Sequence, residues 1–180
     1  MWKKISSKET LVHSRLTVIE DEVVLPSGAK TTYLKFKHRT DTALVIAIRK
    51  DRKILLQKEY SYPQDRELYQ FPGGALEVNE SPEVGANREL AEEARLRAKK
   101  LILLGKFLLN NRRSATMVFV YLGRHLEKAP YLRKDSEEEG IKSFWFSEKE
   151  IEDMIARNKI IIFPVLSAWS LYKAKKNKKL

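Results

Sequence analysis

A cluster of carboxylates is the part of this chain with the clearest capacity for chemistry. Three glutamates are spaced so that a helix would place them on one face: Glu89, Glu92 and Glu93. Like charges this close destabilise a helix by roughly a few tenths of a kcal/mol and raise their own pKa values unless a cation neutralises them. A hard divalent ion takes oxygen ligands of this kind, commonly together with substrate phosphates. The cluster predicts a metal site, and the alternative is a solvated acidic face in which Arg88 pairs with Glu92.

The helix that must carry these glutamates has recognisable ends. Ser81 is a favourable N-cap and Pro82 suits the first helical position, so the sequence predicts a helix from there to about Arg95. A loop that contains Gly73 and Gly74 would lead into it. The opposite face of the helix is apolar and is expected to pack on the core through Leu90, Ala91 and Ala94.

This segment resembles the signature of the Nudix hydrolases, G-x5-E-x7-R-E-U-x-E-E-x-G-U, in which U is apolar. Gly74 is followed after five residues by Glu80 and after seven more by the run at residues 88–93, and Leu96 closes the pattern. Arg95 departs from the signature because it stands where the last glycine is expected. That glycine is a backbone element and not a ligand, so the departure concerns only the shape of the helix end.

The resemblance implies a set of metal ligands. Glu89 and Glu93 would be the principal ligands of Mg²⁺, with Mn²⁺ as a possible substitute. Glu92 would be a further ligand or a contact through water, and the carbonyl of Gly73 would complete the site. Glu93 therefore counts as catalytic as well as metal-binding.

The resemblance also assigns roles to the rest of the motif. Arg88, counted among the catalytic residues, would pair with Glu80 and fix the loop against the helix. Gly74 and Glu80 would be structural. The three histidines have no spacing that suggests a ligand or a base.

Composition limits the class of protein. A chain of 180 residues with 43% hydrophobic residues fits one domain, which we expect to comprise an N-terminal β extension at 1–40, a catalytic core at 41–172 and a basic tail at 173–180. The absence of cysteine excludes a disulfide framework, a thiol nucleophile and a thiolate zinc site. The first residues lack the apolar core of a signal peptide, and no apolar run is long enough to cross a membrane, so we expect a cytoplasmic protein.

The formal net charge of +11 raises the question of nucleic-acid binding. Five of the lysines lie between Lys173 and Lys179, and without them the charge is about +6. A moderate positive charge suits an enzyme with a phosphorylated substrate, because it attracts anions. We interpret the tail as a frayed, solvated end, and the alternative is weak, salt-sensitive binding to RNA or a membrane surface.

The first third of the chain has the pattern of strands and turns. Residues 11–24 alternate loosely, residues 26–28 form a turn, and residues 31–36 resume an extended pattern. The apolar run at 43–48 predicts a central strand, which we expect to form a hairpin with residues 54–57. This order resembles the ADP-ribose and nucleoside-diphosphate-sugar branch of the family, in which an N-terminal sheet precedes the catalytic domain.

Candidate substrate contacts follow this sheet. Residues 59–63 lie where that branch commonly has Gln-Tyr-Arg, and Ser61 replaces the arginine that helps to hold the substrate in relatives. ADP-ribose itself therefore stays an open choice. Tyr60 and Glu67 are candidate substrate-binding residues, although tyrosines here equally suit packing on the rim of a sheet. Gln70 occupies the position of a usual glutamate.

Two arginines lie in a loop between the strands expected at 101–109 and 117–122. Arg112 and Arg113 are candidates to clamp a diphosphate, because a guanidinium matches phosphate oxygens bidentately. The alternative is that they are ordinary surface arginines.

An acidic loop at 134–140 precedes a short strand at 144–146. In the same family branch such a loop often carries a general base or an additional metal ligand. Glu137 and Glu139 match best as the functional pair, while a shift by one residue selects Glu138. The alternative is an acidic, mobile surface loop.

Two structural helices should end the chain. A capping box at 147–150 opens one of them, and Pro164 starts the other, with Val165, Trp169 and Tyr172 facing inward.

Taken together, these features predict a mixed α/β fold, an α/β/α sandwich with an additional N-terminal antiparallel sheet. The expected activity is Mg²⁺-dependent hydrolysis of a nucleoside diphosphate linked to another group, of the ADP-ribose or nucleotide-sugar type. The alternatives are a house-cleaning hydrolase of non-canonical nucleoside triphosphates and an RNA-associated Nudix protein. The resemblance also implies a homodimer, in which the N-terminal sheet of one subunit, including residues 31–36, helps to build the other's substrate site.

Overall fold

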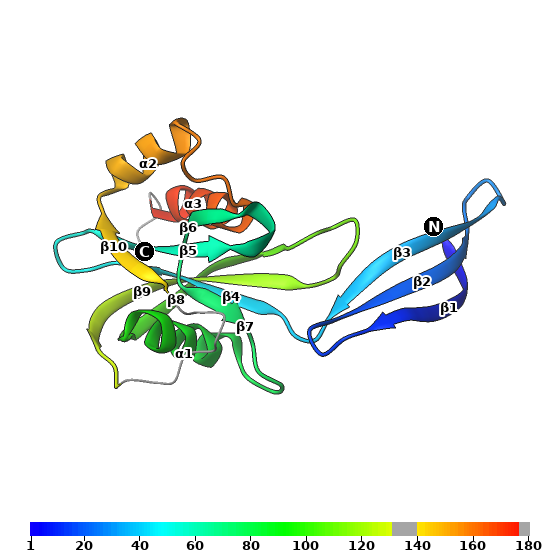
Figure 1. Cartoon of the computed structure of the whole chain (residues 1–180), viewed down its shortest axis with the longest axis horizontal. Coiled ribbons are helices and arrows are strands. Elements are labelled where there is room, and N and C mark those ends of the chain that lie inside the picture. Colours follow the sequence, from blue (N-terminus) through cyan, green and yellow to red (C-terminus); the bar gives the residue numbers. More distant parts are fainter. Residues whose placement is uncertain (131–139, 177–180) are drawn as a thin grey trace. The chain divides into compact units, whose positions relative to one another are not determined.

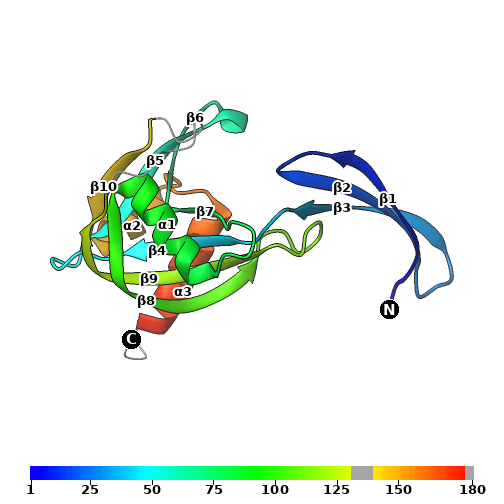
Figure 2. The same ribbon diagram turned by 90° about the horizontal axis from the view of Figure 1, so that it is seen from below.

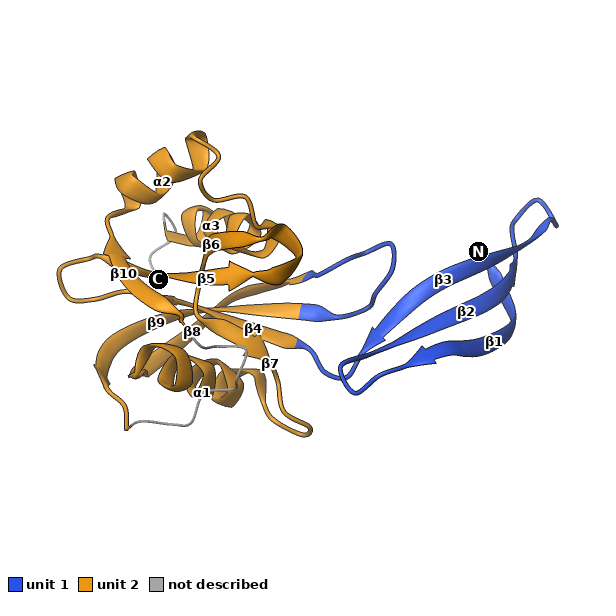
Figure 3. Cartoon of the chain, viewed as in Figure 1, with its two compact units in different colours: residues 1–41, 108–117 blue, residues 42–107, 118–180 orange. Residues whose placement is uncertain are grey.

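The computed structural model describes residues 1–130 and 140–176, and these form two compact units (Figure 3). Unit 1 comprises Met1–Asp41 with Leu108–Met117, and unit 2 comprises Thr42–Phe107 with Val118–Leu180. The expected division of a single domain at residues 40 and 172 stays a prediction. Within the described residues no helix has both the length and the apolar character needed to cross a membrane.

Unit 1 is built on an antiparallel sheet of three strands in the order β1-β2-β3 (Figure 1). The strands are β1 (Lys3–Val12), β2 (Leu16–Val24) and β3 (Lys30–His38). Ile19 and Val23 of β2 are buried, and so is Asp21, which accepts a hydrogen bond from Ser7 and pairs with Lys35. This is the N-terminal antiparallel sheet that the sequence predicts.

The predicted continuous strand at 11–24 is wrong, because the chain turns between β1 and β2. The amide of His13 donates to the carbonyl of Leu16, and the two strands then pair antiparallel. Every residue of β1 is exposed, so the strand has no alternation of buried and exposed residues that a sequence pattern could reveal.

Two sheets lie in unit 2 within the described residues. The larger has the order β7-β4-β9-β8 and consists of β4 (Thr42–Ala47), β7 (Gly73–Ala75), β8 (Leu96–Leu108) and β9 (Met117–Lys128). Strands β4 and β9 are parallel, whereas β7 pairs antiparallel with β4 and sets Gly73 opposite Leu44. The five residues 43–47 are buried, as expected of a central strand.

The predicted hairpin of residues 43–48 with 54–57 is wrong, because residues 54–57 belong to the smaller sheet. It has the order β10-β5-β6 and consists of β5 (Ile54–Ser61), β6 (Arg66–Gln70) and β10 (Lys142–Phe146), with a short 3₁₀ helix at Tyr62–Gln64. A turn at 49–53 follows β4, but only the bridge between Ile48 and Ile54 joins the two arms of the expected hairpin. Both edges of β4 are occupied by β7 and β9, so β5 enters the other sheet.

Three helices complete the described part of unit 2: α1 (Pro82–Ala94), α2 (Glu148–Ala156) and α3 (Phe163–Lys176). Figures 1 and 2 show α1 on one side of the larger sheet and α3 on the other. Leu90 and Ala86 of α1 belong to a buried cluster with Ala43 and Val45 of β4. The mixed α/β sandwich is therefore confirmed.

The C-terminal helices follow their sequence signals, with one correction. Ser147 and Glu150 form the predicted capping box, and the three predicted inward residues of α3 are buried. However, α3 continues through Lys176, so the interpretation of residues 173–176 as a frayed end is wrong. Lys173 pairs with Glu152 at 2.6 Å, and Lys176 pairs with Glu148 at 2.6 Å. Cations also suit a helix C-terminus, which the lysine count alone did not suggest.

Candidate active site

Helix α1 begins and ends where the sequence predicts. The Ser81 hydroxyl accepts a hydrogen bond from the amide of Val84, and Pro82 occupies the first turn. Arg95 caps the other end with a left-handed backbone (φ 54°), and its amide donates to the carbonyls of Ala91 and Leu90. Glycine adopts this conformation at little cost, and Arg95 adopts the same conformation here. The helix end is therefore intact although an arginine stands where a glycine was expected.

Two of the three clustered glutamates of α1 are buried. Glu89 is 5% exposed and Glu93 is 7% exposed, whereas Glu92 is only partly buried. The amide of Gly73 donates to Oε2 of Glu93 at 3.0 Å. Buried carboxylates are uncommon unless they are paired, bonded or bound to a metal.

Two glycines bring the backbone of β7 against these carboxylates. A Cβ at Gly73 would lie 2.1 Å from the carbonyl oxygen of Ala43, and the φ of Gly73 is +149°, so only glycine fits there. A Cβ at Gly74 would lie 2.8 Å from Oε1 of Glu89, which would displace that carboxylate. The glycines therefore allow strand and helix to meet at the acidic face.

Arg88 joins the loop to the helix, as predicted. Its Nε and Nη2 donate to the two carboxylate oxygens of Glu80, each at 3.0 Å, and Nη2 also donates to the carbonyl of Ala75 at 3.1 Å. Its Nη1 lies 2.9 Å from Oε1 of Glu89 and 2.7 Å from Oε2 of Glu92. One guanidinium thus contacts three carboxylates within 3.0 Å and one carbonyl at 3.1 Å, and it lies 3.9 Å from a fourth carboxylate, that of Glu77.

These contacts shift the ionisation of both partners. Burial acts to lower the pKa of Arg88, but Glu80, Glu89 and Glu92 raise it, and the net pKa is above its ordinary value. The Arg88 guanidinium in turn lowers the pKa of Glu80 from its ordinary 4.5. This pairing stabilises the fold above about pH 4.5, and the contribution is lost as the pH falls through the lowered pKa.

The donor set fits a hard divalent cation. It consists of the buried carboxylates of Glu89 and Glu93 and the adjacent carboxylate of Glu92, all of which supply oxygen atoms, and the backbone of Gly73 lies against Glu93. Across residues 1–130 and 140–176, no three acidic or histidine side chains are already gathered as a metal centre. Arg88 contacts Glu89 and Glu92, so these carboxylates would exchange a guanidinium for the metal.

The candidate substrate residues Tyr60 and Glu67 lie opposite each other on β5 and β6. The Tyr60 hydroxyl donates to Asp65 at 2.8 Å, and its side chain remains half exposed. Glu67 pairs with Lys58 at 2.6 Å and with Lys142 at 3.2 Å, and these bonds lower its pKa. The strand pairing therefore places these two candidate substrate-binding residues side by side.

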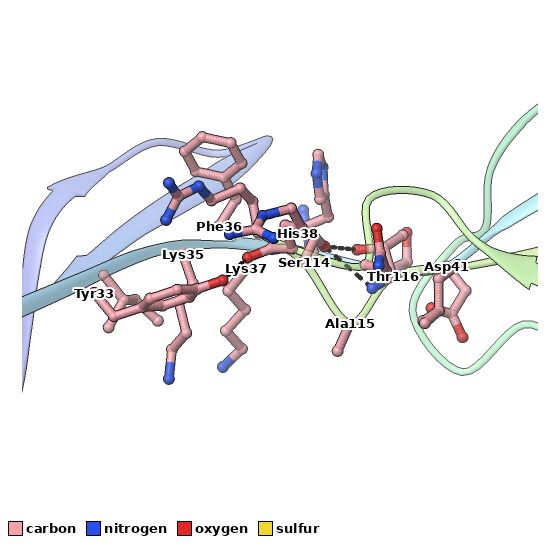
Figure 4. Close-up of a pocket in the computed structure, with 16 residues that line it drawn as sticks. Tyr33, Lys35, Phe36, Lys37, His38, Asp41, Ser114, Ala115 and Thr116 are labelled. Carbon is pink, nitrogen blue, oxygen red and sulfur yellow. Dashed lines mark hydrogen bonds between the residues drawn. The ribbon is translucent and has the colours of Figure 1, made fainter. Parts of the chain in front are cut away.

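Arg112 and Arg113 belong to unit 1, where they line a cavity of about 830 Å³. Figure 4 shows Lys35, Lys37 and His38 of β3 in the same cavity. Arg113 donates to the carbonyl of Leu34 at 2.8 Å and its guanidinium lies 4.9 Å from the centre of the Tyr33 ring. Arg112 is bound through its backbone, because its carbonyl accepts from the Tyr33 hydroxyl.

Some predicted residues fall outside the structure, and one candidate was missed. Glu137, Glu138 and Glu139 lie outside the described residues. Gln57 of β5 is fully buried, and neither its Oε1 nor its Nε2 has a hydrogen-bond partner among the described residues. A buried, unsatisfied amide is costly by about 1–3 kcal/mol. In the sequence, Gln57 is a single polar residue after an apolar run, and this did not mark it as a candidate.

The sequence was found to be similar to a known protein family and to several of its members. The NUDIX domain matches residues 38–166. An ADP-ribose pyrophosphatase of Bacillus subtilis (strain 168) is 29% identical over 140 residues, which cover 78% of this chain and 75% of that protein. The diphosphoinositol polyphosphate phosphohydrolase 3-alpha of Mus musculus is 36% identical over 121 residues, which cover 67% of this chain and 68% of that protein.

A solved structure shares the fold over nearly the whole length. The crystal structure of an ADP compounds hydrolase matches with a TM-score of 0.88, covering 99% of this chain and 96% of that one, at 18% identity. An identity this low supports the fold alone.

Proposed function

The chain belongs to the Nudix hydrolase family, and on that premise we propose that it is a magnesium-dependent enzyme that cleaves the diphosphate of ADP-ribose or a nucleotide sugar. The observation that carries the proposal is the pair of buried carboxylates, Glu89 and Glu93, against the backbone of Gly73 and Gly74. A protein that only bound a ligand would have no need to bury two like charges at this point. The products would be a nucleoside monophosphate and a phosphorylated remainder.

We propose for the site residues the roles that the family resemblance implies. Glu89, Glu93 and the carbonyl of Gly73 would hold Mg²⁺, and Glu92 would bind it directly or through water. When bound, the ion supplies positive charge to the diphosphate oxygens and lowers the pKa of a coordinated water. Arg88 keeps the loop against the helix through Glu80, and so holds Gly73 at Glu93.

The reaction needs a base as well as positioned carboxylates. The oxygen of water forms a bond to one phosphorus while the bond from that phosphorus to the bridging oxygen breaks. The proton of the attacking water passes to a carboxylate, for which we propose Glu137 or Glu139, with Glu138 as the alternative. The protein mainly positions the reactants and balances charge.

The nature of the substrate rests on relatives and on candidate contacts. The name of the Bacillus relative supports ADP-ribose. We propose Tyr60 and Glu67 as the substrate contacts of unit 2, and Arg112 and Arg113 as the candidate substrate contacts of unit 1. Ser61 stands where an arginine was expected, so ADP-ribose is not the sole choice. The murine relative, which is 36% identical, favours a second candidate: a diphosphate carried by a phosphorylated inositol.

A substrate screen tests the proposed reaction. We expect ADP-ribose to yield AMP and ribose 5-phosphate in the presence of Mg²⁺, and chelation of the metal to abolish turnover, because the carboxylates alone would repel the diphosphate. Products are measured by anion-exchange chromatography. Hydrolysis of diphosphoinositol phosphates alone would select the second candidate, and hydrolysis of nucleoside triphosphates alone would contradict the proposal.

The two arginines of unit 1 should differ in effect. Arg112→Ala should raise KM about tenfold, the cost of roughly one charge-assisted hydrogen bond, with the midpoint of thermal unfolding unchanged. Arg113→Ala should lower that midpoint, because it removes the bond to Leu34 and the contact with Tyr33. Steady-state kinetics and calorimetry separate the two outcomes. A KM unaffected by Arg112→Ala would remove Arg112 from the substrate site.

We also propose a homodimer formed through the sheet of unit 1. Large apolar side chains are exposed on β1, on β3 and at the N-terminus: Trp2, Ile5, Leu11, Val12, Leu34 and Phe36. Exposed apolar patches of this kind commonly mark an interface. Sedimentation equilibrium at micromolar concentration should give twice the chain mass of 21.0 kDa. A mass of 21.0 kDa would rule out the dimer.

A further inference from the structure

The cavity of about 830 Å³ lies wholly within unit 1. One wall consists of residues of β3 and the segment that follows it, up to Asp41, and the other consists of residues 111–116 in the loop between β8 and β9. Ile19 of β2 also lines it. None of the glutamates of the candidate metal site belongs to this lining, so the cavity can bind a ligand of its own.

Three hydrogen bonds hold the two walls of the cavity together. The amide of Phe36 donates to the carbonyl of Arg113 at 2.6 Å, and Nη1 of Arg113 donates to the carbonyl of Leu34 at 2.8 Å. The Tyr33 hydroxyl donates to the carbonyl of Arg112. The loop is therefore fixed on β3, and its arginines are in place before any ligand binds.

The lining of this cavity has an excess of positive charge. Five lining residues are cationic: Lys35, Lys37, Arg39, Arg112 and Arg113. Asp41 is the acidic residue of the lining, and its Oδ1 accepts a hydrogen bond from the amide of Met117 at 2.9 Å. One carboxylate cannot balance five cations, so the cavity favours an anionic ligand.

Three of these cations are available to a ligand. Lys35 is paired with the buried Asp21, and Arg113 is bound to β3. The side chains of Lys37, Arg39 and Arg112 are exposed and make no hydrogen bond or ion pair with any other part of the chain that the structure describes. Unpaired like charges in one cavity repel each other unless an anion offsets them. The ligand should therefore carry several negative charges.

The other polar groups of the lining indicate which anion it is. They are hydroxyls and one amide: Thr40, Asn111, Ser114 and Thr116. Together with arginine and lysine, serine, threonine and asparagine are the side chains that contact the phosphates and sugars of nucleic acids. The lining therefore has the composition of a nucleic-acid backbone site.

The cations also recur along β3. Figure 4 shows Lys35 and Lys37 pointing to one side of the strand and Phe36 to the other. Alternate residues of a strand share a face and lie about 6.8 Å apart. A row of cations of this kind suits a chain of phosphates better than a single phosphate. It also lies on the opposite side of β3 from Phe36, which belongs to the apolar surface proposed for the dimer.

We propose that this cavity binds the sugar–phosphate backbone of a single-stranded nucleic acid, with Lys37, Arg39 and Arg112 as phosphate contacts. A hollow can receive a flexible single strand, whereas a duplex is read by an element that protrudes into its groove. Binding through phosphates does not depend on base sequence. The proposal goes beyond the hydrolase activity and does not rest on it, because Lys37 and Arg39 are not substrate candidates.

The test is the salt dependence of binding, measured by fluorescence anisotropy on the full chain with labelled oligouridine and oligodeoxythymidine of about 12 nucleotides. Three phosphate contacts predict a slope of about −2 for the logarithm of the association constant against the logarithm of the salt concentration. Lys37→Gln and Arg39→Gln should each weaken binding about tenfold at low salt and reduce the slope by about 0.7. Tighter binding of oligouridine identifies RNA as the ligand through its 2′-hydroxyls, and equal binding identifies the backbone that RNA and DNA share.

Lys30→Gln is the matched control, because it removes the same charge from an exposed position of β3 outside the cavity. It should keep the affinity and the slope of the parent chain, and so should a chain without residues 177–180, which lacks two lysines of the tail. Lys37→Gln and Arg39→Gln should keep the thermal midpoint, since both side chains are exposed. Full affinity in both of these variants, loss of binding on removal of the tail, or equally ready displacement of the oligonucleotide by polyglutamate would overturn the proposal.

Discussion

The candidate active site depends on the contacts of one guanidinium. Arg88 binds Glu80 through two hydrogen bonds, contacts Glu89 and Glu92 through Nη1, and reaches the carbonyl of Ala75. Removal of one partner from a buried ion pair typically costs about 3–5 kcal/mol, because the other charge is left unpaired. Without Arg88, the charge of Glu89 would be hard to keep buried. The acidic face of α1 exists because this side chain balances it.

The glycines of β7 supply the complementary constraint. Gly73 pairs with Leu44 of β4 and donates its amide to Glu93, while Gly74 leaves room for the carboxylate of Glu89. The central strand β4 thereby fixes the position of the loop, and α1 packs on the same strand through Ala86 and Leu90. Both sides of the site are therefore set by contacts with one buried strand. In the Nudix family such a site serves pyrophosphate hydrolysis.

Local sequence signals predicted the local features of this site well. The cap at Ser81, the end of α1 at Arg95 and the pairing of Arg88 with Glu80 depend on residues close in the chain, and all are confirmed. Arg95 shows why its departure from the family pattern is tolerated: the helix end needs a left-handed backbone, which arginine can adopt at some cost.

Features that depend on distant partners were not predictable. The prediction of a hairpin after β4 was wrong because the pattern of apolar residues does not say which sheet a strand joins. The basic C-terminus proved partly helical because Glu148 and Glu152 of α2 bind Lys173 and Lys176, a pairing no local pattern encodes. Likewise, the buried amide of Gln57 belongs to no sequence pattern.

The most direct test of the account is the turnover of Glu93→Gln, measured against Mg²⁺ concentration on whichever diphosphate substrate the wild type hydrolyses. This change keeps the shape of the side chain and removes its charge, so kcat should fall at least ~10²-fold. Glu83→Gln in the exposed first turn of α1 is the matched control and should retain wild-type turnover. Wild-type turnover and Mg²⁺ dependence in Glu93→Gln would contradict the assignment of the buried carboxylates as the catalytic metal site.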